Sequence, residues 1–267
     1  MLFNIHTEKE AQDTLKRLTS IPFSVWKGES AHFNEYTYCD DFLEATIKKY
    51  GTSLPRFDDI DFVISHITTS ANACREIKEN GLIDLGSVYK SPDSELRMFI
   101  ERHGIEIRLD CNCLKYGNRY FDISFDNLPG LSDTEDTETY KAWLVGRRFN
   151  YDFCVNGFLQ IDPKSIYPGY VHKRPEILQN IDDLFHLNLS KEWAQSHSTY
   201  EVIAKVSGRN LVCDSEQPTS DGKVIYYLCQ AYNAAYSDRS TIVEILKNNI
   251  QIPARDILQI NPFPFWG

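Results

Sequence analysis

The stretch Asp61–Thr69 (DFVISHITT) decides how this chain is interpreted, because it is short and rich in β-branched residues. Such residues favour strands, so we predict a strand over 61–69. Ser70 is the predicted N-cap of a helix over 71–80, and Gly81 is its predicted C-terminal stop. The pattern predicts a compact strand–helix unit.

Two polar residues interrupt apolar strand faces. Side chains alternate along a strand, so His66 shares its face with Ile64 and Thr68. The same alternation in Thr241–Leu246 (TIVEIL), a second predicted strand, places Glu244 between apolar neighbours. A buried carboxylate without a partner is costly, so it must be paired, face a cleft or face water.

Taken alone, each polar residue has a structural interpretation. His66 is typical of a core imidazole bonded to a neighbouring carbonyl, and Glu244 of an edge-strand carboxylate facing water. The interpretation of His66 and Glu244 as site residues is favoured only when the two are taken together, each in its own sequence context.

Composition limits the class of protein. The 267 residues suit one large domain or two small ones, and 13% aromatic content excludes a disordered or collagen-like chain. A net charge of −10 argues against permanent binding to nucleic acid or anionic membrane, but leaves a local basic groove open. The seven cysteines contain no C-x-x-C pair, so we expect neither a metal site nor a disulfide framework, and a reduced cytoplasmic location.

The remaining pattern is mixed, with strands concentrated after residue 60. We predict a helix over 7–18, with Thr7 and Glu10 forming a capping box. A strand within 149–161 is expected to break at Asn156-Gly157. Further helices are predicted over 42–50, 94–102, 140–145 and 223–235, and further strands over 105–109, 120–125, 199–206 and 257–260. The fold class is α+β.

Two stretches resemble a known family. Residues 62–85 (FVISHITTSANACREIKENGLIDL) are similar to the opening of the ADP-ribosyltransferase fold: a strand with His-x-Thr, then a helix and a Gly-Leu turn. Residues 239–260 (RSTIVEILKNNIQIPARDILQI) resemble its last strands, where a catalytic Glu lies in an apolar strand. The resemblance covers about 45 residues and is nearest to DarT-type and His-Tyr-Glu class toxins.

The resemblance implies a fold and a domain division. It implies a split central β-sheet with flanking helices, forming a catalytic domain over 58–267. Residues 1–57 lie outside the resemblance and are expected to form an N-terminal helical extension.

The resemblance also implies roles in binding NAD as co-substrate. Glu244 would stabilise positive charge at the ribose C1′ as nicotinamide leaves. His66 would hydrogen-bond the adenine-side ribose, with Thr68 in support, and the backbone at Ile67 would hold the nicotinamide amide.

Two further roles follow from the resemblance. Tyr120, with Tyr116 in reserve, would stack on the nicotinamide ring. Arg97 would act on the diphosphate or in catalysis, unless it belongs to a solvated helix face. Ile242 stands where many protein-modifying transferases have Gln or Glu to orient an Arg or Asn acceptor, which argues against arginine modification and leaves nucleic acid, a nucleotide, another acceptor or NAD hydrolysis open.

The expected function is therefore NAD-dependent ADP-ribosylation of a macromolecule, DNA or RNA being favoured, by a bacterial toxin or anti-phage effector. An antitoxin partner is possible, and no membrane association is expected. The alternatives are an RNA 2′-phosphotransferase-like enzyme, an NAD glycohydrolase, or a catalytically silent nucleotide-binding module.

Overall fold

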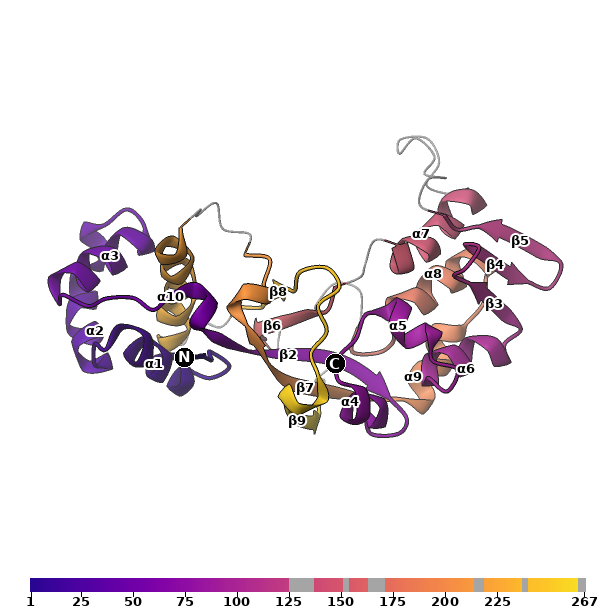
Figure 1. Cartoon of the computed structure of the whole chain (residues 1–267), viewed down its shortest axis with the longest axis horizontal. Helices are drawn as coiled ribbons and strands as arrows, with labels where there is room; N and C mark the ends of the chain where they lie inside the picture. Colours follow the sequence, from indigo (N-terminus) through magenta and orange to yellow (C-terminus); the bar gives the residue numbers. More distant parts are fainter. Residues whose placement is uncertain (125–136, 151–153, 163–170, 214–218, 237–239, 264–267) are drawn as a thin grey trace. The chain divides into compact units, whose positions relative to one another are not determined.

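The computed structural model describes residues 1–124, 137–150, 154–162, 171–213, 219–236 and 240–263 (Figure 1). Over these residues the protein is mixed α+β, as predicted. The helices are α1 (Glu8–Thr19), α2 (Phe23–Glu29), α3 (Cys39–Lys49), α4 (Arg75–Asn80), α5 (Leu85–Lys90), α6 (Glu95–Arg102), α7 (Glu138–Asn150), α8 (Glu176–Phe185), α9 (Leu189–Ser196) and α10 (Ser220–Ala235).

The strands are β1 (Leu2–Phe3), β2 (Asp61–Ser70), β3 (Ile105–Arg108), β4 (Cys113–Tyr116), β5 (Arg119–Asp122), β6 (Asn156–Gln160), β7 (Ser198–Ser207), β8 (Ile242–Ile245) and β9 (Ile257–Pro262). Four short 3₁₀ helices complete the described elements: η1 (Ser30–Glu35), η2 (Phe57–Asp59), η4 (Gly208–Asn210) and η5 (Ala254–Asp256).

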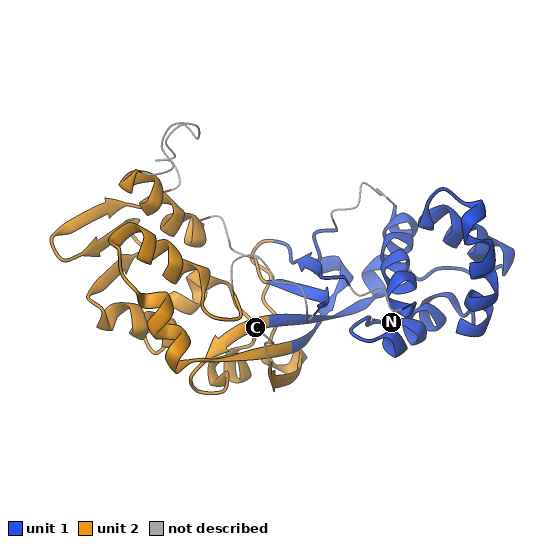
Figure 2. Ribbon diagram, turned by 180° about the vertical axis from the view of Figure 1, so that it is seen from behind, with its two compact units in different colours: residues 1–66, 156–165, 203–247 blue, residues 67–155, 166–202, 248–267 orange. Residues whose placement is uncertain are grey.

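The chain divides into two compact units (Figure 2). Unit 1 comprises Met1–His66, Asn156–Ser165 and Ile203–Lys247, and unit 2 comprises Ile67–Val155, Ile166–Val202 and Asn248–Gly267. Residues 1–57 therefore group with strand and helix residues from much later in the chain. The proposed functional boundary at residue 57 stays a prediction.

The larger sheet has the strand order β8-β6-β2-β7-β9, and β1 pairs with β2 in parallel. Strands β8, β6 and β2 lie side by side in Figure 1, and β6 runs antiparallel to both of its neighbours. Sequence analysis did not predict β1, because its two residues are too few to show a period of two. No specific ADP-ribosyltransferase fold is established by this topology.

Helix α10 covers one part of this sheet in unit 1. The Tyr227 ring of α10 contacts Phe62 of β2 edge-on, with ring centroids 4.7 Å apart, and stacks on Phe57 at 5.6 Å. Helix α1 packs beside α10 and begins at the predicted cap, because the Thr7 side chain accepts the Glu10 N–H. The predicted N-cap at Thr7 is confirmed, and the Glu10 carboxylate accepts a hydrogen bond from the Thr7 hydroxyl.

The predicted helix over 71–80 is wrong in its first turn. Helix α4 begins only at Arg75, and Ala73 and Cys74 have left-handed backbone angles, with φ of 56° and 57°. The Ser70 hydroxyl accepts the N–H groups of Asn72 and Cys74, so it caps a turn instead of the helix. The C-terminal stop at Gly81 is confirmed, with φ of 83°.

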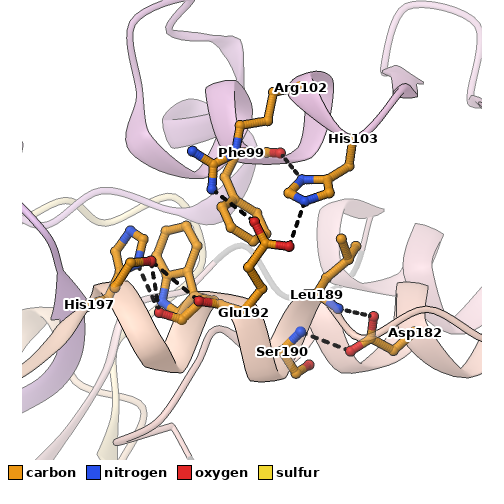
Figure 3. Close-up of polar contacts among 10 residues, drawn as sticks. Phe99, Arg102, His103, Asp182, Leu189, Ser190, Glu192 and His197 are labelled. Atoms are coloured by element: carbon orange, nitrogen blue, oxygen red, sulfur yellow. Dashed lines mark hydrogen bonds and ion pairs between the residues drawn. The ribbon is translucent and has the colours of Figure 1, made fainter.

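Unit 2 holds the three-stranded antiparallel sheet β3-β4-β5 and its own apolar core. The Asp182 carboxylate of α8 accepts the N–H groups of Leu189 and Ser190, which begin α9 (Figure 3). Glu192 of α9 bonds His103 Nε2 at 2.9 Å and lies 3.3 Å from an Arg102 nitrogen (Figure 3). Charged side chains thus join α8 to α9 and α9 to the end of α6.

Among the described residues, no helix combines the length and the apolar character that crossing a bilayer requires.

Candidate functional site

The register of three neighbouring strands places His66 and Glu244 in one row. Ser65 of β2 is opposite Phe158 of β6 in an antiparallel pair, so His66 is opposite Gly157. Gly157 is in turn opposite Glu244 of β8. Directly opposed residues point to the same face of a sheet, so the His66 and Glu244 side chains emerge on one face, about 10 Å apart at the backbone.

Gly157 allows the middle strand to fit under this row. A Cβ atom at Gly157 would lie 2.8 Å from Cδ1 and 3.2 Å from Cβ of Ile64. Ile64 is fully buried beside His66 on β2, so it fills the place that a side chain on Gly157 would take. The predicted break of the strand at Asn156-Gly157 is wrong, because both residues belong to β6.

His66 is half-buried, and its ring is oriented by the backbone of β6. Its Nδ1 lies 2.8 Å from the Asn156 carbonyl oxygen, which can only accept a hydrogen bond. The neutral ring therefore carries its proton on Nδ1, and Nε2 keeps a lone pair. Burial lowers the pKa of His66, while the hydrogen bond to Asn156 acts in the opposite direction.

Glu244 is buried, with 7% of its surface exposed. The Tyr227 hydroxyl of α10 donates a hydrogen bond to Glu244 Oε2 at 2.8 Å. Burial, and then the charge of Glu244, raise the pKa of Tyr227, so this phenol stays a donor. Strand β8 ends the order of strands, but its Glu244 does not face water as the structural interpretation expected. Helix α10 covers this face and provides the Tyr227 hydroxyl as a hydrogen-bond donor.

Ile67 and Thr68 follow His66 on β2, and both belong to unit 2. Ile67 is buried and Thr68 is half-buried. Strand alternation places Thr68 on the face of His66 and Ile67 on the other face.

Arg97 and Tyr120 also belong to unit 2, in elements that carry no other predicted site residue. Arg97 lies on α6 and pairs with Glu101, one turn along, at 2.7 Å. Tyr120 lies on β5 and is 65% exposed, with the Lys115 ammonium 5.5 Å from its ring centre. The structure places His66 and Glu244 on one sheet in unit 1. Arg97 and Tyr120 belong to unit 2 and are not part of that arrangement. Their predicted roles stay predictions.

Sequence analysis missed Gly157 and Tyr227. The signal for Tyr227 was weak, because α10 carries several aromatic residues and only the packing of α10 on the sheet shows which ring meets Glu244. For Gly157 the signal was misleading, because Asn-Gly is a common turn pair.

Two hollows in the described residues lie elsewhere. One, of about 740 Å³, is lined in unit 2 by residues that include Lys141, Asp183 and Lys191. The other, of about 200 Å³, lies in unit 1 beside Arg56 and Lys223. Neither is lined by a predicted site residue. The described residues contain no group of three or more His, Cys, Asp or Glu that could hold a metal ion.

Comparison with known proteins assigns no family: no family model, curated protein or solved structure matches the chain.

Proposed function

We propose that this protein is an NAD-dependent ADP-ribosyltransferase. The observation that supports the proposal is the row formed by His66, Gly157 and Glu244 across β2, β6 and β8. Two polar side chains from residues 178 positions apart in the chain thereby emerge on one face of one sheet. A dinucleotide co-substrate, with its two riboses, is long enough to contact both.

Glu244 would provide the main electrostatic contribution to the reaction. When nicotinamide leaves, the ribose C1′ gains positive charge, and a fixed carboxylate nearby lowers the energy of that state. The Tyr227 hydrogen bond holds Oε2 in one position, so little reorganisation is needed. Burial strengthens the effect, because charges interact more strongly away from water.

His66 would act in binding rather than in proton transfer. Its Nδ1 proton is directed at the Asn156 carbonyl, which leaves Nε2 to accept a hydrogen bond from a ribose hydroxyl. The lowered pKa keeps the ring neutral at physiological pH, and a neutral ring is required for that acceptor role.

The acceptor in this proposal is a macromolecule, with DNA or RNA favoured over protein. Ile242, two residues before Glu244, offers no polar group to orient a protein side chain. The net charge of −10 fits modification of a single base, which needs a small pocket, better than a long nucleic-acid footprint. A bacterial toxin or defence effector is the biological role proposed.

The test is incubation of the full chain with NAD labelled in the adenylate, together with DNA, RNA and protein acceptors. Nicotinamide release and label transfer are measured for the unaltered chain and for Glu244→Gln. We expect Glu244→Gln to lower turnover about 100-fold or more, because it removes the charge and keeps the shape. Glu106→Gln, at an exposed carboxylate of β3, is the control and should retain full turnover.

Absence of both nicotinamide release and label transfer in the unaltered chain, under all acceptor conditions, would refute the enzyme proposal. A folding check by circular dichroism accompanies Glu244→Gln, because this side chain is buried and bonded to Tyr227.

One observation favours a second candidate, a catalytically silent nucleotide-binding module. The Tyr227–Glu244 hydrogen bond also suits a carboxylate whose role is to hold α10 on the sheet. In that case the unaltered chain would bind NAD in calorimetry, His66→Ala would weaken binding, and no nicotinamide would be released.

A further inference from the structure

The hollow of about 200 Å³ in unit 1 lies where the chain just before β2 meets the first turn of α10. Its volume is several times the ~30 Å³ that one water molecule occupies in the liquid, so it has room for a small polyatomic group. The hollow is lined by Arg56, Phe57, Asp58, Ser220 and Lys223.

The walls of this hollow are held together by hydrogen bonding and packing. The Phe57 N–H donates a hydrogen bond to Ser220 Oγ at 2.8 Å, which joins residues 163 positions apart in the chain. The buried Phe57 ring stacks on Tyr227 with centroids 5.6 Å apart, and Lys223 Nζ lies 5.5 Å from the centre of the same ring. Lys223 and Tyr227 are one turn apart on α10, so Phe57 contacts both along one face of that helix.

Three donor groups of the lining have no acceptor among the described residues. Arg56 and Lys223 form no ion pair with a carboxylate in the described part of the chain. Ser220 Oγ accepts the Phe57 N–H, so its own proton remains to be donated. A guanidinium, an ammonium and a hydroxyl from two distant segments therefore line one small space.

We propose that this hollow is a phosphate-binding site. Three separate donor groups suit a ligand that presents three or more oxygens, as a phosphate does, whereas a carboxylate presents two. The Arg56 guanidinium can bind two phosphate oxygens side by side, and the Lys223 ammonium supplies a compact charge. The ligand is a phosphate group, either as the free ion or as part of a nucleic-acid backbone.

The charges of the chain make this proposal specific. A net charge of −10 repels anions in general, so retention of phosphate requires local cations. Asp58, which also lines the hollow, has the same sign of charge as the ligand and opposes its binding. The proposal does not rest on the ADP-ribosyltransferase function, because phosphate binding requires neither NAD nor nicotinamide release.

The experiment titrates the full chain with inorganic phosphate at constant ionic strength and follows binding by phosphorus NMR and by the melting temperature. We expect saturable binding of one phosphate per chain and a melting temperature that rises with phosphate concentration. Arg56→Gln and Lys223→Gln should each weaken binding about 10-fold, because each removes a charge-assisted hydrogen bond. Asp58→Asn should strengthen binding, and acetate should bind more weakly than phosphate.

Lys27→Gln is the matched control, because Lys27 is an exposed lysine of α2 in the same unit and should not affect phosphate binding. Absence of saturable binding by the unaltered chain would overturn the proposal. Equal binding by the Arg56, Lys223 and Lys27 variants would overturn it as well. Arg56 and Asp58 are exposed, so their variants should fold and locate the site even where the Lys223 variant does not.

A second arm distinguishes the two sources of phosphate. A single-stranded DNA oligonucleotide is added to the phosphate-saturated chain. Displacement of phosphate, weakening as salt is raised, would identify a backbone phosphate as the ligand. Retention of phosphate would identify the free ion. Both results support the site and differ only in the source of its ligand.

Discussion

The hydroxyl of Tyr227 and the carboxylate of Glu244 are joined by a 2.8 Å hydrogen bond between α10 and β8. Glu244 is 7% exposed and Tyr227 is 1% exposed, so neither group can readily exchange its partner for water. Tyr227 therefore supplies a hydrogen-bond donor to a carboxylate that is buried at the edge of the sheet, and the bond connects α10 to β8.

Replacement of Tyr227 by Phe should lower the free energy of unfolding by about 1–3 kcal/mol, because it leaves Glu244 buried with one donor fewer. Chemical denaturation measures this change. Tyr38→Phe is the control, because Tyr38 is 67% exposed and its replacement should change stability by less than about 0.5 kcal/mol. Equal stability of the two variants would mean that the bond contributes little.

Replacement of Gly157 by Ala should destabilise the protein by about 1–3 kcal/mol, because the new Cβ would overlap Ile64 Cδ1. Adding Ile64→Val, which removes Cδ1, should recover part of the loss in denaturation experiments. Gly28→Ala in α2 is the control, because a Cβ there meets open space. A Gly157→Ala variant as stable as Gly28→Ala would contradict the packing described for β6.

Stability should fall as the pH drops below about 6.5, in part because of His66. Burial lowers its pKa in the folded state, so between the unfolded value and the folded value the unfolded chain binds more protons. Above this window both states are neutral and His66 contributes no pH dependence. His66→Gln should make the melting temperature less sensitive to pH from 7 to 5; an unchanged pH dependence would show that His66 does not titrate in this way.

Replacement of Asp182 by Ala should lower the free energy of unfolding by about 1–2 kcal/mol, because Leu189 and Ser190 at the start of α9 lose their acceptor (Figure 3). Asp183→Ala, one residue along, is the control, because Asp183 is exposed and accepts a hydrogen bond from the Gln179 side chain. Thermal denaturation of the two variants gives the comparison, and similar losses would rule out a special role for Asp182.

Local patterns predicted the elements better than their ends. The strand at His66 and the strand at Glu244 follow from β-branched composition and alternation, and the start of α1 follows from the Thr7–Glu10 capping box. The start of α4 could not be predicted, because Ser70 bonds a turn that is also held by Glu95, 25 residues away in the chain.

The amino-acid sequence by itself determined the mixed α+β class, the polar interruptions at His66 and Glu244, and the faces of the strands that carry them. These properties depend on neighbours a few residues apart, where backbone geometry alone sets which side chains share a face. Only the tertiary structure decided that Gly157 lies between the two polar residues and that Tyr227 meets Glu244. Strand order and helix packing bring together residues far apart in the chain, and the shape of distant side chains determines those contacts.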